Sequence, residues 1–251
     1  MSIALYAFTC GHLTIPFKSF LEGEEGLLTV PVPAYLLVHP KGSVLFDTGL
    51  NPHAVDPNGS YFDSIHPSNQ IRVSTPELLN ARFEQAGLDI AGVTHVINSH
   101  LHYDHAGGNS LAPDVPILIQ KRELDHARAV GTAGGYVSAD FETGQSFTML
   151  NGEHDLFGDG SIVCMPTFGH TPGHQSLKVT TTTGTYILAG DACYLRRTLD
   201  DMHLPRFRYN DEQMLASLRA LKALQQRGAR IMYGHDPEFW ETVPQAPVRL
   251  A

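Results

Sequence analysis

The sequence has few cysteines and no long hydrophobic run. Cys10, Cys164 and Cys193 are odd in number and far apart, so they do not form a disulfide framework, which fits a reducing cytoplasm. No stretch reaches the length that a membrane helix needs. The opening residues, MSIALYAFTCGHLTIPF, have no basic start and only a short apolar run, so they make a poor signal peptide. We therefore expect a cytoplasmic protein without membrane insertion.

Basic residues are also scarce. The chain has 17 Lys and Arg against 26 Asp and Glu, a formal net charge of -9, and no local run of basic residues. An acidic surface repels a phosphate backbone, which argues against nucleic acid as a partner. At 251 residues, the chain is long enough for one substantial core, and we expect a single domain over residues 1–251.

Apolar runs mark the expected strands. Residues 35–38 and 43–47 flank Pro40 and Gly42, which predicts a hairpin ending at Asp47. Further strands are expected at residues 93–100, 115–120, 161–167, 185–191 and 229–236.

Three helices are expected between the strands. Residues 74–89 predict a helix with Thr75 as its N-cap, Pro76 at the first helical position and Gly87 at its end. Residues 121–130 predict a second helix, and residues 210–228 a third that begins with a capping-box pattern from Asn210 to Gln213. Because strands and helices alternate in both halves, we expect a layered α/β fold. The long polar loop at residues 51–74 suggests a functional loop.

The stretch INSHLHYDHAGGN covers residues 97–109. Six consecutive residues inside it, 100–105, contain four side chains of the kinds that bind metals. His100 and His102 are two apart, so on an extended chain they face the same side and can reach one ion. Asp104 and His105 follow at the turn, where they can face a second ion. Imidazole and carboxylate without thiolate suit zinc in an open hydrolytic site, with iron, manganese or cobalt as substitutes. A polar loop with solvated histidines is the weaker interpretation, because the spacing is that of metal ligands.

Further ligands stand at the ends of later strands. They are His170 and His174 in TFGHTPGH, Asp191 in LAGDACY and His235 in MYGHD. Each follows an apolar strand and has a glycine close by, so these polar groups are expected on one rim of the fold.

The order of these residues resembles the metallo-β-lactamase superfamily. His-x-His-x-Asp-His is followed by His170, Asp191 and His235, and Asp47 in LFDTG matches an early aspartate of the family. The segments SHLHYDHAGGN, GHTPGHQSL, DACY and GHD resemble one branch, the N-acyl-homoserine lactonases that hydrolyse quorum-sensing signals. The match covers nearly the whole chain. It implies an αββα sandwich, with two mixed sheets between outer helices and two zinc ions at one edge.

The resemblance also implies a role for each ligand. The first ion would be held by His100, His102 and His170, and the second by Asp104, His105 and His235. Asp191 would bridge the two ions together with a hydroxide. His174 and Asp47 would orient other groups, and Phe168 stands where many relatives have proline.

In this family pattern the bridging hydroxide attacks the lactone carbonyl, Asp104 carries a proton to the leaving oxygen, and Tyr194 donates a hydrogen bond to the carbonyl. The expected activity is therefore opening of the lactone ring of N-acyl-homoserine lactones. Alternatives are another metallo-lactonase, for example on a pyridoxine-derived lactone, a related thioester or phosphodiester hydrolase, or a metal- or signal-binding module without turnover. A monomer and a homodimer both stay open.

Two smaller questions stay open at this point. Phe17, Phe20 and Leu21 fit an apolar groove for the acyl chain and a core position equally well. Cys193, beside Asp191, reads as a small packed residue, because no base is evident for it. The remaining histidines, among them His66, have no comparable spacing partner and are interpreted as ordinary residues.

Overall fold

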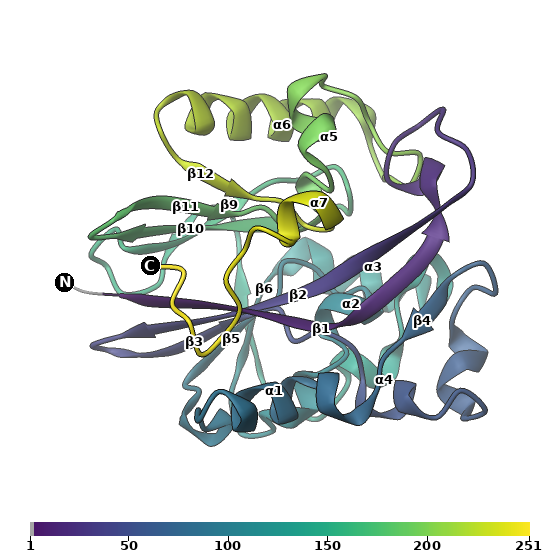
Figure 1. Ribbon diagram of the computed structural model, residues 1–251, viewed down its shortest axis with the longest axis horizontal. Coiled ribbons are helices and arrows are strands. Elements are labelled where there is room, and N and C mark those ends of the chain that lie inside the picture. The colour runs from purple at the N-terminus through teal and green to yellow at the C-terminus, as the bar shows by residue number, and fades with distance from the viewer. Residues whose placement is uncertain (1–2) are drawn as a thin grey trace.

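A computed structural model of the chain describes residues 3–251. It has two sheets packed face to face (Figure 1). The first sheet has the strand order β4-β1-β2-β3-β5-β6-β7 and the second has the order β12-β11-β10-β9-β8. Both sheets are mixed, because β3, β5, β6 and β7 pair in parallel in the first and β11 pairs in parallel with β12 in the second.

The strands differ widely in length. Those of the first sheet are β1 (Ala4–Pro16), β2 (Leu27–His39), β3 (Gly42–Phe46), β4 (Gln70–Arg72), β5 (His95–Ile97), β6 (Ile117–Gln120) and β7 (Phe147–Leu150). Those of the second are β8 (His154–Asp155), β9 (Ile162–Pro166), β10 (Gln175–Thr181), β11 (Gly184–Leu188) and β12 (Arg230–Met232).

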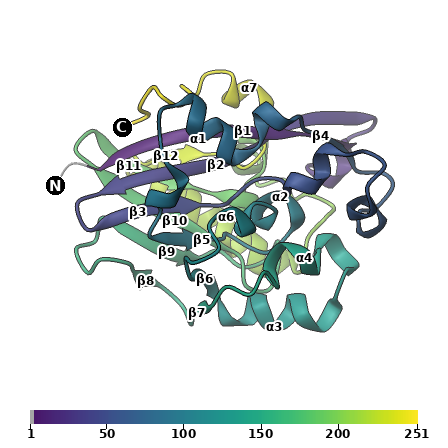
Figure 2. The ribbon, with the colours of Figure 1, turned by 90° about the horizontal axis from the view of Figure 1, so that it is seen from below.

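Helices cover the outer face of each sheet. They are α1 (Leu79–Gln85), α2 (Tyr103–Ala106), α3 (Lys121–Val130), α4 (Ser138–Phe141), α5 (Arg196–Asp200), α6 (Asp211–Gln226) and α7 (Pro237–Trp240). In Figure 1, α5 and α6 lie above the second sheet and α1 and α4 lie below the first. Figure 2, seen from below, shows α1, α2 and α4 in front of the first sheet. The layers are therefore helix, sheet, sheet and helix, which confirms the predicted αββα sandwich.

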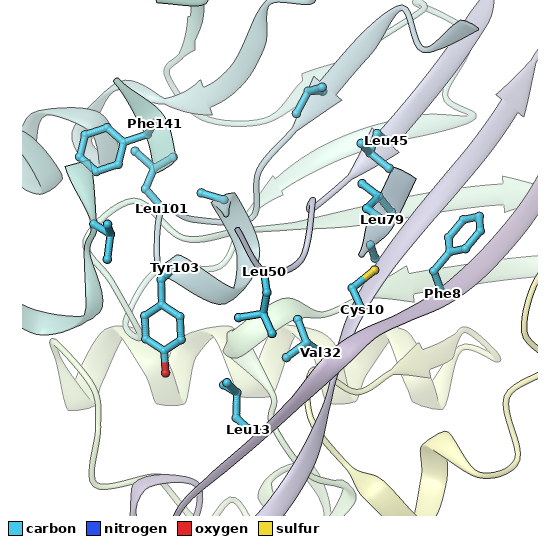
Figure 3. Packing of buried hydrophobic residues seen from close by; sticks show 14 of the residues in the cluster. Phe8, Cys10, Leu13, Val32, Leu45, Leu50, Leu79, Leu101, Tyr103 and Phe141 are labelled. Atoms are coloured by element: carbon cyan, nitrogen blue, oxygen red, sulfur yellow. The ribbon is translucent and has the colours of Figure 1, made fainter. Parts of the chain in front are cut away.

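Successive side chains of β1 point alternately into two separate hydrophobic cores. Leu5 and Ala7 point between the sheets, where they join the cluster that contains Leu218 of α6. Tyr6 and Phe8 point to the other face, and Phe8 stacks on Phe83 of α1 with ring centroids 5.0 Å apart. Figure 3 shows this second core, which continues as far as the residues beside the site. A strand buried on both faces shows this alternation of cores rather than an apolar–polar pattern.

Most of the predicted elements are present, with some corrections. The hairpin, the helix at residues 121–130 and the long helix are confirmed. Thr75 is not an N-cap: it lies inside a 3-10 turn, Thr75–Glu77, and the Ser74 hydroxyl and backbone N–H both donate to the Glu77 carboxylate, at 2.6 and 2.9 Å. The chain is extended at Leu78 before α1 begins. The capping pattern of α6 is half formed, because Asn210 accepts from the Gln213 N–H while Gln213 Oε1 has no hydrogen-bond partner among residues 3–251.

The three cysteines are free and buried, so within the described residues no disulfide forms, as expected. None of the helices found between residues 3 and 251 is long and apolar enough to cross a membrane.

Candidate metal centre

The predicted ligands come together at one edge of the sandwich. The chain that leaves β5 carries His100 and His102 into the N-terminus of α2, and α2 itself presents Asp104 and His105. The other three side chains follow the ends of strands of the second sheet: His170 comes after β9, Asp191 after β11 and His235 after β12. The strand predicted at residues 93–100 is shorter than expected, because the chain must leave the sheet at Ile97 to turn these side chains toward the second sheet.

The first cluster consists of three imidazoles. His100 Nε2 lies 2.9 Å from His102 Nδ1 and 3.2 Å from His170 Nε2, and the last two atoms are 3.1 Å apart. Two ligands bound to one tetrahedral zinc at 2.0–2.1 Å are about 3.3 Å apart, so the spacing fits one ion. Asp191 Oδ2 completes the group at 3.3 Å from His170 Nε2.

The second cluster adjoins the first and contains more negative charge. His105 Nε2 and His235 Nε2 each lie 3.1 Å from Asp191 Oδ1, and Asp104 Oδ2 lies 3.6 and 3.5 Å from them. Asp191 therefore presents one oxygen to each cluster. His105 Nε2 and Asp191 Oδ1 are buried and have no hydrogen-bond partner among the described residues. Buried polar atoms without partners are costly, and a cation between them would satisfy both.

Burial and charge set the pKa values differently in the two clusters. Burial lowers the pKa of His100 and His102 well below the ordinary value and that of His170 to about 4, so these rings are neutral, the form that binds metal. Burial acts in the same direction on His105 and His235, but Asp191 and Asp104 outweigh it and raise both pKa values. The second cluster thus attracts positive charge more strongly than the first.

Hydrogen bonds from behind orient rings of both clusters. Asp47 Oδ2 lies 2.9 Å from His105 Nδ1, which turns the other nitrogen of that ring toward Asp191. His235 Nδ1 donates to the Pro31 carbonyl oxygen at 2.8 Å. The Tyr194 hydroxyl lies 3.0 Å from His170 Nδ1. Partners of this kind set the tautomer and direction of a ligating histidine. The placement of Asp47 agrees with the orienting role that the resemblance implies.

His174 does not face either cluster. Its Nε2 accepts the backbone N–H of Asp191 at 3.0 Å, so its Nδ1 carries the proton toward Thr167 Oγ1, 2.9 Å away. Both ring nitrogens are therefore in use. His174 is placed to fix the turn that presents Asp191, in agreement with the family pattern.

A cavity of about 520 Å³ opens over the second cluster. Asp104, Asp191, His235 and Tyr194 reach its floor. Its apolar wall residues are Leu13, Ile15, Phe20, Ile65, Tyr103 and Phe207, and its polar ones include Ser19, His66, Ser68 and Asn69. A cavity of this size falls within the usual range for small-molecule sites.

The open question about three apolar residues is answered by this cavity. Phe20 lines it, with its ring centroid 5.2 Å from that of Tyr194. Leu21 is fully buried in the core, and the partly buried Phe17 packs against the same core. Of these three residues only Phe20 lines the cavity, and it is also buried in that core.

Residues 63–66, 68 and 69 form a further part of the cavity wall, here called the loop side. The loop that contains them is tied down by Asp140 of α4, which is fully buried. Asn51 Nδ2 donates to Asp140 Oδ1 at 2.7 Å and the Tyr61 hydroxyl donates to Asp140 Oδ2 at 2.9 Å. Sequence reasoning missed Asp140 and treated His66 as an ordinary residue. The long polar loop was the only signal pointing to this side of the site.

The sequence is similar to a known protein family and to curated proteins. The family model of the metallo-beta-lactamase superfamily matches residues 28–235. The N-acyl homoserine lactonase AttM of Azorhizobium caulinodans is 31% identical, over 98% of this chain and 97% of its own length. The N-acyl homoserine lactonase of Bacillus cereus is 30% identical, over 84% of each chain.

Solved structures show the same likeness. An N-acyl homoserine lactone hydrolase, with the product N-hexanoyl-L-homoserine bound at its catalytic metal centre, superposes with a TM-score of 0.89. It is 26% identical and the match covers all of both chains. AidC, a dizinc quorum-quenching lactonase, is only 18% identical and shares the fold, with a TM-score of 0.69 over 94% of this chain and 88% of its own.

Proposed function

Since the chain belongs to the metallo-β-lactamase superfamily, we propose that it opens the lactone ring of N-acyl-homoserine lactones, using two zinc ions and water to give the open hydroxy acid. One observation carries the proposal. Both clusters, Asp104 and Tyr194 meet beneath a cavity with a partly apolar wall, which suits a small ring with an acyl tail. The similarity to lactonases over almost the whole chain supports the same conclusion.

We assign the ligands as the two clusters divide them. The first ion is assigned to His100, His102 and His170, and the second to Asp104, His105 and His235. Asp191 is assigned to both, because its two oxygens face different clusters. Two bound zinc ions would lower the pKa of a shared water and stabilise negative charge on a carbonyl oxygen. The absence of thiolates from both clusters fits zinc, iron, manganese or cobalt in a hydrolytic site, and we propose zinc.

Tyr194 is placed to donate a hydrogen bond to the substrate. As a ligand, His170 must present an unprotonated Nε2, so its proton is on Nδ1 and is donated to the Tyr194 oxygen. The phenol proton can then be donated to the lactone carbonyl in place of the neighbouring Asp191 carboxylate. Burial raises the pKa of Tyr194 well above its ordinary value, so the phenol keeps that proton at neutral pH. A hydrogen bond from this donor strengthens as charge builds on the carbonyl oxygen.

Asp104 is placed for proton transfer. Its carboxylate reaches the cavity floor between His105 and His235. From there it can accept a proton from the attacking water and deliver it to the ring oxygen that leaves. An alkoxide is a poor leaving group without this proton, so Asp104 has a chemical role in addition to its role as a ligand.

Two wider features of the protein are proposed with the activity. We treat residues 1–251 as one domain, because ligands from both sheets are needed to complete one site. We also propose that the enzyme works in the cytoplasm, which the three free, buried cysteines support.

A substrate panel tests the proposal. Zinc-loaded protein is incubated with homoserine lactones of several acyl lengths, a pyridoxine-type lactone, a thioester and a phosphodiester, and proton release is followed. We expect turnover of the homoserine lactones at rates that vary with acyl length. Exclusive turnover of any other substrate, or none by protein shown to hold two ions, would overturn the assignment. Asp104→Asn is the control for background hydrolysis.

A further inference from the structure

Glu123 is a buried carboxylate that the proposed reaction does not use. It lies in the first turn of α3 and is fully buried, and no Lys, Arg or His pairs with it in the part of the chain that the structure describes. Its charge is satisfied by donors instead. Glu123 Oε1 accepts the Leu101 N–H at 3.2 Å and the Tyr136 hydroxyl at 3.0 Å, and Oε2 accepts the Gly173 N–H at 3.0 Å. Burial of an ionised carboxylate is costly unless such bonds compensate it.

The three donors belong to three segments around the first cluster. Leu101 stands between His100 and His102, and Gly173 is in the loop that carries His170. Tyr136 pairs with His102 through the backbone, and its ring centroid is 4.7 Å from that of His102. One carboxylate therefore connects both loops that supply the imidazoles of this cluster to the segment that packs beside them.

The close approach of α3 is built into the sequence. A Cβ atom at Gly173 would lie 2.3 Å from the Glu123 backbone nitrogen, so no other residue fits there without moving the helix or the loop. A Cβ atom at Gly135 would lie 3.2 Å from the His102 ring. The packing therefore holds Glu123 directly against the ligand loops.

We propose that Glu123 is a positioning residue for the first metal site: it fixes the His100–His102 segment relative to the His170 loop and places a negative charge behind the three neutral imidazoles. The inference rests on the ligand assignment proposed above. A loop that loses its hydrogen bond to Glu123 can move its histidine away from the ion. Removing a partner that orients a metal ligand typically lowers metal affinity 10–100-fold. His105 and His235 of the second cluster contact Asp47 and the Pro31 carbonyl, and in the described part of the chain Glu123 accepts no hydrogen bond from the segments next to them, so this site should be unaffected.

Metal affinity, measured by competition with a chelator, provides the test. Glu123→Gln removes the negative charge. It also replaces one carboxylate oxygen by an NH₂ group, which cannot accept a hydrogen bond from a backbone N–H of the ligand loops. We expect one of the two zinc ions to bind 10–100-fold more weakly and the other to bind as in the wild type. Asp125→Asn is the matched control on α3, since Asp125 is exposed and, among residues 3–251, forms an ion pair only with Lys121. This variant should bind both ions normally.

A second variant separates positioning from folding. Tyr136→Phe removes one hydroxyl and leaves the ring against His102, so a smaller weakening of the same ion, up to about 10-fold, is expected. Thermal unfolding of the metal-free proteins is measured in parallel. If Glu123→Gln is unfolded, Tyr136→Phe decides, and normal affinity for both ions there refutes the proposal. Normal affinity in a folded Glu123→Gln also refutes it. A wild type that never binds two ions would instead overturn the ligand assignment.

Discussion

The two sides of the cavity are built in opposite ways. On the metal side the ligands stand at strand ends or on α2, they are buried, and rings such as His105, His170 and His235 are each held by a hydrogen bond from behind. The loop side belongs to the loop at residues 51–74, which contains only short 3-10 turns and the brief strand β4. One of its attachments is Asp140, which accepts hydrogen bonds from Asn51 and Tyr61 of this loop.

This difference separates chemistry from substrate selection. A rigid scaffold keeps reacting groups within the narrow geometry that catalysis requires, while a loop tolerates changes in shape. Substitutions on the metal side should therefore alter metal content and kcat, and substitutions on the loop side should alter KM.

Asp104→Asn should be the most damaging single change on the metal side. It weakens the second metal site and removes the proton carrier, so we expect kcat/KM to fall by roughly 1000-fold or more, about 4 kcal/mol. Steady-state lactone hydrolysis and metal analysis on the same sample measure both effects. A variant with both ions and near-normal turnover would remove Asp104 from the mechanism.

His170→Ala and His174→Ala are a matched pair, since both are buried histidines of one loop. We expect His170→Ala to lose one ion and most activity. His174→Ala should retain both ions with affinity or activity lowered about 10–100-fold, because it only supports the turn that presents Asp191. Metal content of the two variants decides the order, and the reverse order would exchange their assigned roles.

Tyr194→Phe should have an intermediate effect. The ring remains, so both ions should stay, although His170 Nδ1 loses its partner. Because the metals already stabilise part of the charge, we expect kcat/KM to fall roughly 10–100-fold, about 1.4–2.8 kcal/mol. Full activity of this variant on every lactone tried would show that the phenol has no catalytic role. The proposed lactonase would then lose the support of Tyr194, while the dimetal hydrolase site would be unaffected.

Asp140→Asn should change catalysis least. The loop loses a carboxyl anchor but no group that touches the metals, so we expect KM to rise a few-fold, by roughly 1 kcal/mol, with kcat and metal content unchanged. Phe62→Leu is the control for a general loss of packing in the same loop, because it leaves Asp140 and its hydrogen bonds in place. A drop in kcat or metal content with unchanged KM would contradict the division between the two sides.

Ionisation of Asp140 should make the stability of the protein depend on pH. Burial raises the pKa of Asp140 to about 7, although hydrogen bonds from Asn51 and Tyr61 act in the other direction. For an acid with a raised pKa, the contribution to stability is fully present below the unfolded value near 4 and is lost as pH rises through about 7. Asparagine cannot ionise, so Asp140→Asn should gain stability relative to the wild type, by a few kcal/mol, between pH 5 and 8. Denaturant unfolding at both pH values measures this, and a constant difference would place the ionisation elsewhere.

The metal side was predictable from sequence because its signals are local. His100, His102, Asp104 and His105 lie within six residues, and their spacing alone indicates a metal site that has room for a second ion. The later ligands follow recognisable apolar strands with a glycine close by. The pairing of His170, Asp191 and His235 with particular ions, in contrast, depended on the family resemblance.

The anchor of the loop side, Asp140, and the buried Glu123 were not predictable, because their hydrogen-bond partners are distant in sequence. Asp140 meets Asn51 and Tyr61 across 89 and 79 residues, and Glu123 meets Gly173 across 50. No local pattern marks such pairs. The strand β1 was missed for a related reason: it is buried on both faces, so its alternation divides two cores and leaves no clear apolar–polar period.

The most direct test of the account is a titration of metal-free protein with zinc while hydrolysis of N-hexanoyl-homoserine lactone is measured at each step. The cooperation of two clusters through Asp191 predicts that activity rises with added zinc and reaches its plateau at two equivalents per chain. A plateau at one equivalent, or two bound ions with no lactone hydrolysis, would contradict it.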